Sequence, residues 1–157
     1  MKLKPSAGSS IFNDENSVMK TFQTHSAEET TQLGRQLSAE LRPGTIVLLR
    51  GDLGAGKTTM VKGIAEGFNA AKAEDVTSPT FTLIHEYRGP AVTLFHIDLY
   101  RIDTQRELDT LALDDLMSPQ SILLIEWGEK FQRFAKERDV EIAIEHRGGD
   151  ERIIRIG

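Results

Sequence analysis

The sequence has no cysteine among its 157 residues. This absence excludes disulfides, thiolate catalysis and Cys-ligated zinc or iron–sulfur centres. The four histidines form no H-E-x-x-H or comparable pair, so a histidine-built zinc site would need distant residues to converge. Long apolar runs are also missing, because the longest have four residues, far below the roughly 18–20 that span a bilayer. No apolar segment follows the first lysines, and a cytoplasmic protein without membrane contact is expected.

The chain is also short of positive charge. It has 19 basic and 24 acidic residues, which gives a formal net charge of −5. Affinity for a nucleic-acid backbone depends on clustered Lys and Arg, so the balance argues against a broad nucleic-acid-binding face and leaves a local basic patch open. Hydrophobic residues make up 39% and charged residues 27%, as in an ordinary globular protein. The length predicts one domain.

Two parts of the chain differ in composition. Residues 1–17 are rich in Ser, Asn, Pro and Gly and lack hydrophobic periodicity, which predicts a flexible tail. Residues 18–157 are predicted to form the single domain. Its expected helices are residues 27–41, 57–68, 104–117 and 129–136, the first of them opened by a capping box between Ser26 and Glu29. Its expected strands are residues 19–24, 45–50, 82–87, 91–98, 121–125, 140–144 and 152–156.

The order of these elements indicates the fold class. Strands alternate with helices in the middle of the chain, whereas 82–98 and 140–156 each read as an antiparallel hairpin with a Gly-containing turn. We therefore expect an α/β, three-layer domain of the P-loop NTPase type, with a mixed, mainly parallel central sheet and antiparallel edge hairpins.

A phosphate-binding motif lies between a buried strand and a helix start. Residues 51–58, GDLGAGKT, match G-x-x-x-x-G-K-[ST], and no third glycine follows that would make a dinucleotide-binding fingerprint. Glycines let backbone N–H groups turn toward an anion, and the helix dipole faces the same charge. Lys57 is expected to bridge the β- and γ-phosphates and Thr58 to ligate Mg²⁺. The predicted nucleotide-binding residues are Gly51, Asp52, Leu53, Gly54, Ala55, Gly56, Lys57, Thr58 and Thr59.

Two apolar strands end in an acid, Asp98 and Glu126. Ligands gather at the carboxyl ends of strands in open α/β sheets, so both carboxylates are expected to point toward the phosphates. The alternative is a solvated strand-end acid without a role. Either residue fits the acid that holds Mg²⁺, and periodicity does not choose between them. The predicted metal ligands are Thr58, Asp98 and Glu126, and the predicted catalytic residues are Lys57, Asp98 and Glu126.

Three further features stand near these acids. Residues 76–82, here called the hydroxyl-rich loop, form either a plain surface turn or a switch whose order depends on the nucleotide. His96 is interpreted as packed within its strand rather than catalytic. Trp127 is expected near the nucleotide if Glu126 binds Mg²⁺.

Taken together, the motifs resemble those of a known family. GDLGAGKTT at 51–59, TSPTFTL at 77–83, H-x-D-x-Y-R at 96–101 and I-E-W at 125–127 occur in the order and spacing of the TsaE family, over about residues 20–135. The resemblance implies an ATPase that uses ATP and Mg²⁺ and works with TsaD and TsaB, which modify the adenosine next to the tRNA anticodon with a threonylcarbamoyl group. It implies that ATP turnover resets this complex and that tRNA is contacted indirectly, through the complex.

The resemblance also assigns roles to residues. In the family, the P-loop Lys and Thr, the Asp of H-x-D-x-Y-R and the Glu of I-E-W serve nucleotide, metal and hydrolysis. These positions correspond to Lys57, Thr58, Asp98 and Glu126.

Two other functions remain open from the sequence. A small P-loop kinase would need an acceptor pocket and further arginines, for which Arg101 is a candidate, and would consume ATP without free phosphate only when an acceptor is present. A switch GTPase acting as a binding module would need a guanine-reading N-K-x-D segment and a D-x-x-G switch, which the chain lacks. Nucleotide competition separates that case from an ATPase.

Overall fold

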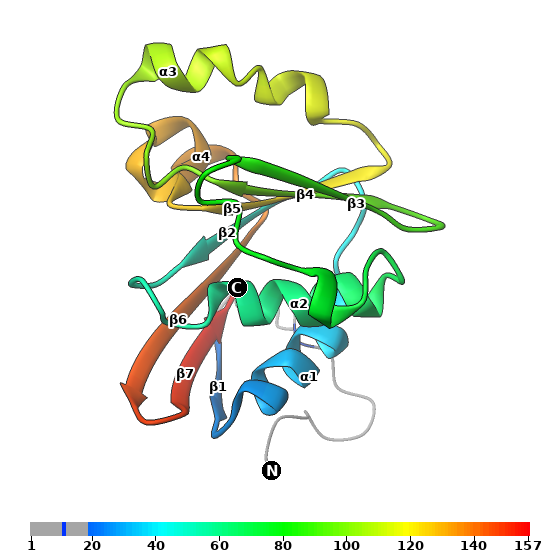
Figure 1. The fold of residues 1–157 in the computed structure, drawn as a ribbon, viewed down its shortest axis with the longest axis vertical. Coiled ribbons are helices and arrows are strands. Elements are labelled where there is room, and N and C mark those ends of the chain that lie inside the picture. The colour runs from blue at the N-terminus through cyan, green and yellow to red at the C-terminus, as the bar shows by residue number, and fades with distance from the viewer. Residues whose placement is uncertain (1–10, 12–18) are drawn as a thin grey trace.

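The computed structural model describes Ile11 and residues 19–157. Within this part of the chain, seven strands form one sheet in the order β1-β7-β6-β2-β5-β4-β3 (Figure 1). The strands are β1 (Lys20–Thr24), β2 (Ile46–Arg50), β3 (Ile84–Arg88), β4 (Thr93–Asp98), β5 (Ser121–Glu126), β6 (Val140–Gly148) and β7 (Glu151–Ile156). The predicted flexible tail lies outside the described residues except for Ile11, which is buried and donates its N–H to Glu40 Oε2 at 2.9 Å.

The middle of the sheet is parallel and its edges are antiparallel. β6, β2, β5 and β4 pair in parallel, whereas β3 pairs antiparallel with β4, and β7 with both β6 and β1. This confirms the predicted mixed sheet with edge hairpins. The register sets Glu126 opposite Leu49 on one side and Asp98 on the other. The ends of β2, β5 and β4 therefore meet at one edge of the sheet.

Helices cover both faces of the sheet and complete three layers (Figure 1). One core cluster joins α1 (Ala27–Ser38) and α2 (Lys57–Gly67) to one face, and its members include Leu33, Leu37, Met60, Ile64, Val47, Leu49, Leu94, Leu124, Ile142 and Ile154. The second lies under α3 (Gln105–Thr110) and α4 (Gln132–Glu137), with Leu48, Ile97, Leu108, Leu113, Leu123, Ile125 and Phe134. Successive side chains of a sheet strand point alternately into these two core clusters, because the side chains of a β-strand repeat every two residues. No described helix is long and apolar enough to cross a membrane.

Several element boundaries differ from the expected ones. α1 ends at Ser38 rather than at 41. The predicted helix 104–117 is split into α3 and a 3₁₀ segment, η2 (Leu113–Leu116), by Ala112 at φ 51°. The predicted helix 129–136 is likewise split into η3 (Gly128–Lys130) and α4. A third 3₁₀ segment, η1 (Ala73–Asp75), follows α2.

The start of α1 follows the predicted capping pattern with one change. Ser26 Oγ accepts the N–H of Glu29 at 3.0 Å, as in a capping box. The Glu29 carboxylate, however, accepts the N–H of His25 at 2.9 Å instead of the N–H of Ser26. The cap therefore also fixes the chain just before the helix.

Candidate functional site

The P-loop occupies the connection between β2 and α2, where the sequence predicted it. α2 begins at Lys57, and the residue before it, Gly56, has φ 115° and makes no side-chain cap. Side-chain-bearing residues rarely adopt this left-handed backbone, so a glycine is required there. The first N–H groups of α2 therefore remain available to an anion, to which the helix dipole also presents its positive end.

A cavity of about 320 Å³ lies against the P-loop. It brings together most of the predicted site and adds residues from the hydroxyl-rich loop and β7; its lining consists of Leu53, Gly54, Gly56, Lys57, Thr58, Thr59, Ser78, Thr80, Asp98, Glu126, Trp127 and Arg152. Three predicted nucleotide-binding residues do not line it. Ala55 is buried, and Gly51 and Asp52 line a neighbouring cavity instead.

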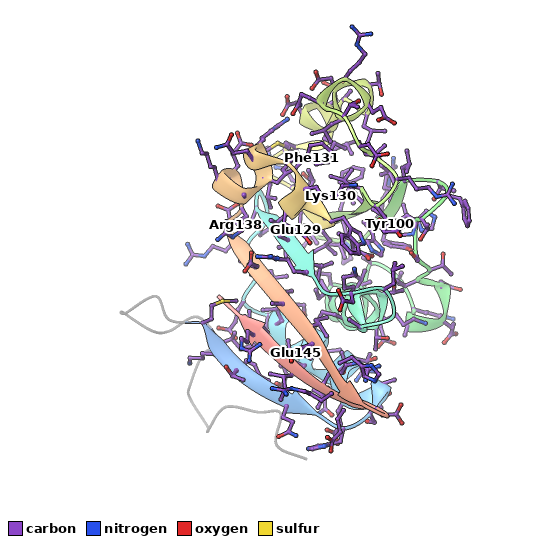
Figure 2. All side chains as sticks on the ribbon, turned by 90° about the vertical axis from the view of Figure 1, so that its left-hand side faces the viewer. Tyr100, Glu129, Lys130, Phe131, Arg138 and Glu145 are labelled. Carbon is purple, nitrogen blue, oxygen red and sulfur yellow. The ribbon has the colours of Figure 1, made fainter. Side chains whose placement is uncertain are left out.

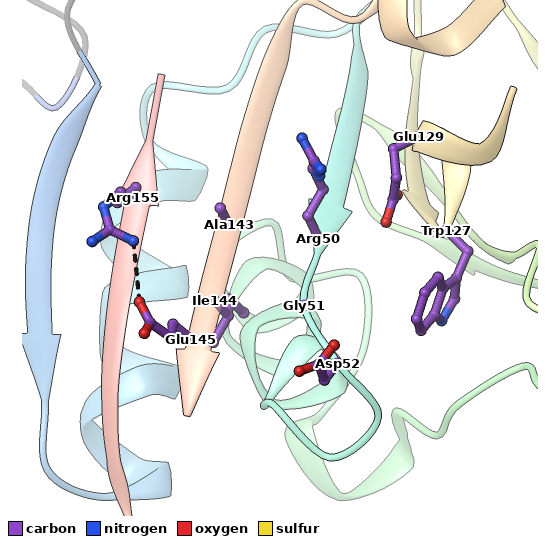
Figure 3. A pocket seen from close by; sticks show the side chains of 9 residues that line it. All are labelled: Arg50, Gly51, Asp52, Trp127, Glu129, Ala143, Ile144, Glu145 and Arg155. Carbon is purple, nitrogen blue, oxygen red and sulfur yellow. Dashed lines mark hydrogen bonds and ion pairs between the residues drawn. The ribbon is translucent and has the colours of Figure 1, made fainter. Parts of the chain in front are cut away.

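The neighbouring cavity has a volume of about 290 Å³ and lies at the end of β2 (Figure 3). Trp127 and Glu129 stand on one side of Gly51, and the Glu145–Arg155 ion pair, 3.4 Å between Oε2 and Nη1, stands on the other. Trp127 lines both cavities. It therefore forms part of the wall between them.

Lys57 is buried, with 5% of its surface exposed. Its Nζ donates to the Gly51 carbonyl at 2.5 Å, lies 3.9 Å from Glu126 Oε1 and sits 4.2 Å from the centre of the Trp127 ring. Removal from water lowers the pKa of Lys57, and nearby carboxylates, Glu126 first among them, oppose this shift. A buried ammonium group with one backbone acceptor is suited to receive phosphate oxygens.

The two strand-end acids are both buried, with 4% of Asp98 and 3% of Glu126 exposed. The structure thus contradicts the alternative of solvated acids. Asp98 Oδ2 accepts a hydrogen bond from Thr80 Oγ1 at 3.1 Å, and Oδ1 accepts the N–H of Tyr100 at 2.9 Å. Glu126 Oε2 is bonded to His96 Nε2 at 2.5 Å. The acids lie opposite each other in the β4–β5 register, so their carboxylates face one cavity.

His96 is fully buried within β4, which confirms that it is packed in its strand. Its bond to Glu126 was missed by the sequence reasoning. A signal was present, because residues 96 and 98 share one face of a strand and Asp98 was already expected at the site. The partner strand and its register, which place Glu126 beside them, are set by long-range pairing.

The hydroxyl-rich loop reaches the cavity through Ser78 and Thr80, whose hydroxyls lie 2.8 Å apart. The His85 side chain on β3 contacts two residues of this loop. Its Nε2 lies 2.8 Å from Thr82 Oγ1 and its Nδ1 lies 3.1 Å from the Thr77 carbonyl. The loop therefore forms part of the cavity wall and contacts Asp98, unlike a plain surface turn, and its dependence on the nucleotide stays a prediction.

Arg152 of β7 is a second residue that the sequence reasoning missed. Its Nε donates to the Ala55 carbonyl at 2.6 Å, and its Nη1 donates to the carbonyls of Gly149 and Glu151 at 3.1 and 3.0 Å. The terminal hairpin is thereby tied to the P-loop. No local motif marks this arginine, since it contacts a segment 97 positions earlier in the chain.

A lysine links the segments that follow the two acids. Lys130 Nζ donates to the carbonyls of Leu99 and Tyr100 at 3.2 and 3.0 Å, and Figure 2 shows Lys130 beside Tyr100. The Tyr100 ring in turn packs 5.2 Å from the Trp127 ring. These contacts hold the chain beyond β4 against the chain beyond β5.

The oxygen donors at the cavity suit Mg²⁺ bound together with a nucleotide. Thr58, Asp98 and Glu126 all line the cavity, and Mg²⁺ takes oxygen ligands. In the part of the chain that the structure describes, no three His, Asp or Glu side chains gather into a metal cage. Mg²⁺ does not need one, since it commonly uses one or two carboxylates, waters and substrate phosphates.

Comparisons with known proteins agree on one family. The family model described as "Threonylcarbamoyl adenosine biosynthesis protein TsaE" matches residues 24–154. The tRNA threonylcarbamoyladenosine biosynthesis protein TsaE of Bacillus subtilis is 38% identical over 133 residues, which cover 85% of this chain and 82% of that protein. The protein of the same name from Rickettsia bellii is 35% identical over 132 residues, covering 84% and 90%. The crystal structure of YdiB from Bacillus subtilis superposes with a TM-score of 0.70 at 34% identity, covering 88% of this chain and 84% of that one.

Proposed function

The chain belongs to the TsaE family and so to tRNA threonylcarbamoyladenosine biosynthesis, and we propose that it serves this pathway as a Mg²⁺-dependent ATPase. The observation that carries the proposal is the convergence of Lys57, Asp98 and Glu126 on one cavity at the P-loop. A buried cation, two buried carboxylates and the start of a helix are the groups that phosphoryl transfer to water requires.

Each residue has a part in this reaction. ATP hydrolysis breaks the bond between the γ-phosphorus and the β–γ bridging oxygen while a water oxygen bonds to the same phosphorus. Lys57 exchanges the Gly51 carbonyl for β- and γ-phosphate oxygens. Thr58, Asp98 and Glu126 are the residues that would hold Mg²⁺, which neutralises phosphate charge when bound.

The two acids differ in the oxygens that they offer. Both oxygens of Asp98 already accept a hydrogen bond from the protein. Glu126 has one oxygen bonded to His96 and the other, Oε1, on the side of Lys57. We therefore assign to Glu126 Oε1 the orientation of the attacking water and the acceptance of its proton.

The first test removes the negative charge of each acid. Asp98→Asn and Glu126→Gln preserve side-chain shape, so both variants are expected to melt near the parent temperature. Their phosphate release is expected to fall about a hundredfold or more, because the metal and water site has lost a charge. Unchanged turnover in both variants would remove the hydrolytic role.

The second test concerns ATP binding. Lys57→Ala is expected to lower ATP affinity about ten- to a hundredfold in calorimetry, because charge-assisted bonds to the phosphates are lost. Lys62→Ala is the control, since Lys62 is a lysine of the same helix that lines neither of the two cavities at the P-loop. Parent-like ATP binding by Lys57→Ala would show that the P-loop assignment is wrong.

The proposed partners are TsaD and TsaB, with tRNA contacted through their complex and ATP turnover resetting it, in the cytoplasm. For the kinase alternative, the Arg101 guanidinium lies 4.3 Å from the centre of the Phe81 ring and outside the P-loop cavity. Arg101 lines a separate cavity of about 640 Å³ that shares Trp127 with the P-loop cavity. Loss of ATP without free phosphate, only when an acceptor is present, tests this alternative. A guanine-specific alternative is tested by competition of GTP against ATP.

A further inference from the structure

We infer that His96 is a positioning residue for Glu126. Its Nε2–H donates to Oε2 and so leaves Oε1 as the carboxylate oxygen on the side of Lys57. The Nε2–Oε2 distance is 2.5 Å and the Oε1–Nζ distance is 3.9 Å. The inference rests on the proposed ATPase function and adds to it a residue that does not line the cavity.

The hydrogen-bond inventory around the ring fixes its tautomer. His96 Nδ1 is buried and has no partner, whereas Nε2 faces a carboxylate oxygen. An ionised carboxylate only accepts hydrogen bonds, so Nε2 carries the proton. Placing a proton on Nδ1 instead would leave a buried N–H without an acceptor and two acceptors facing each other, which is the costlier arrangement.

Burial makes this contact a rigid support. His96 has no exposed surface and Glu126 has 3%. His96 lies opposite Leu124, two residues before Glu126 on the same face of β5, so the bond runs diagonally between paired strands. A supporting bond of this kind holds a reacting carboxylate in one orientation, and small displacements of such groups cost large factors in rate.

The native protein tests the hydrogen bond directly. In a ¹⁵N-histidine-labelled sample, long-range ¹H–¹⁵N correlation distinguishes the two neutral tautomers of each ring. We expect His96 to show a protonated Nε2, with its proton shifted downfield by the short bond, and an unprotonated Nδ1. A protonated Nδ1 with a bare Nε2 overturns the inference.

Variants test the consequence for the reaction. His96→Leu is expected to lower kcat of phosphate release about tenfold or more, as losses of supporting bonds do. Its affinity for a non-hydrolysable ATP analogue is expected to stay within roughly threefold, because the P-loop holds the phosphates. His96→Gln keeps an N–H donor at the end of its side chain, and its kcat is expected to lie well above that of His96→Leu.

A matched control separates positioning from stability. Leu94 is fully buried, lies two residues earlier on the same face of β4 and belongs to the apolar core. Leu94→Ala is expected to lower the melting temperature while kcat, measured well below that temperature, remains near the parent value. Equal kcat losses in Leu94→Ala and His96→Leu would overturn the inference, because destabilisation alone would then explain the effect.

The outcomes of these experiments distinguish the positioning role of His96 from the proposed ATPase function. Parent-like kcat in His96→Leu, with Glu126→Gln inactive, overturns the positioning role and leaves the ATPase intact. A parent protein that hydrolyses no ATP, alone or with TsaD and TsaB, overturns both. If His96→Leu does not fold, the tautomer of His96 in the parent protein decides the matter, since a protonated Nδ1 with a bare Nε2 overturns the inference.

Discussion

Lys57 is a buried cation whose surroundings would change on the proposed binding of a nucleotide. Burial lowers its pKa below the ordinary 10.5, while Glu126, Glu129, Asp98 and Asp52 raise it, in that order of effect. Phosphate oxygens in contact with Nζ would add to the second group of effects. The pKa of Lys57 is therefore expected to shift in opposite directions on folding and on the proposed binding of ATP.

The sign of the pH effect follows from the lowered pKa. Between the folded-state pKa and 10.5, the unfolded chain binds more protons at Lys57 than the folded one, so this residue makes stability rise with pH across that window. We expect the free energy of unfolding of the nucleotide-free parent, minus that of Lys57→Met, to increase with pH there. Urea unfolding of both proteins at a series of pH values measures it. A flat or falling difference would contradict the burial effect.

At the residue scale, the sequence predicted the groups whose positions follow from local rules. The glycine and lysine spacing of the P-loop motif indicates a backbone turn that binds an anion. Asp98 and Glu126 stand at the ends of apolar strands, and in an open α/β sheet such strand ends lie at one edge. His96 and Arg152 act through contacts made across the sheet or between distant segments. Such contacts depend on strand register, which no local pattern specifies.

At the scale of elements, α2 is held against α1 by a close backbone approach. A Cβ added at Gly63 would lie 1.9 Å from the Thr31 carbonyl oxygen, a distance that forces the helices apart. α2 carries Lys57 and Thr58 at its start. The position of the P-loop relative to the sheet therefore depends on this contact.

Gly63→Ala is expected to lower the free energy of unfolding by about 2 kcal/mol or more, because overpacking a tight contact costs that much despite the better helix propensity of Ala. Urea unfolding measures the change, and Lys62→Ala, one position earlier and not fully buried, serves as control. A parent-like stability of Gly63→Ala would show that the helices separate at little cost.

The same scale shows where periodicity misleads. Leu108 and Leu113 both enter the core under α3, yet residues five apart point in different directions on a continuous helix. The left-handed turn at Ala112 brings both inward and divides the predicted helix. An alanine in the sequence does not predict a left-handed turn, whereas the glycines in the turns of the two hairpins did predict those turns.

At the scale of the whole molecule, the sheet brings two acidic and two basic side chains to the cavity of the candidate site. Asp98 and Glu126 line the cavity with Lys57 and Arg152. The Arg152 guanidinium is bonded to three backbone carbonyls and serves the P-loop and hairpin. Among the residues lining this cavity, Lys57 is therefore the cation that we expect to contact the phosphates.

With only one such cation, we predict a weak ATPase that the proposed partners stimulate. The transition state of phosphoryl transfer spreads negative charge over the γ-phosphate oxygens, and an arginine supplied by another protein can stabilise it by a rate factor of about 10³ or more. We expect slow phosphate release by the free protein and a large increase when TsaD and TsaB are added together.

The hydroxyl-rich loop would let the proposed partners detect which nucleotide is bound. Thr80 links this loop to Asp98, so Mg²⁺ arriving with a nucleotide and binding the Asp98 carboxylate would change the support of the loop. If the partners bind the ATP-bound arrangement better, linkage requires that the complex also hold ATP more tightly by the same factor. Phosphate release with and without the partners, and partner affinity in ATP against ADP, measure both effects. Turnover by the free protein at the rate of the complex, together with partner affinity that ignores the nucleotide, would rule this mechanism out while leaving the P-loop site in place.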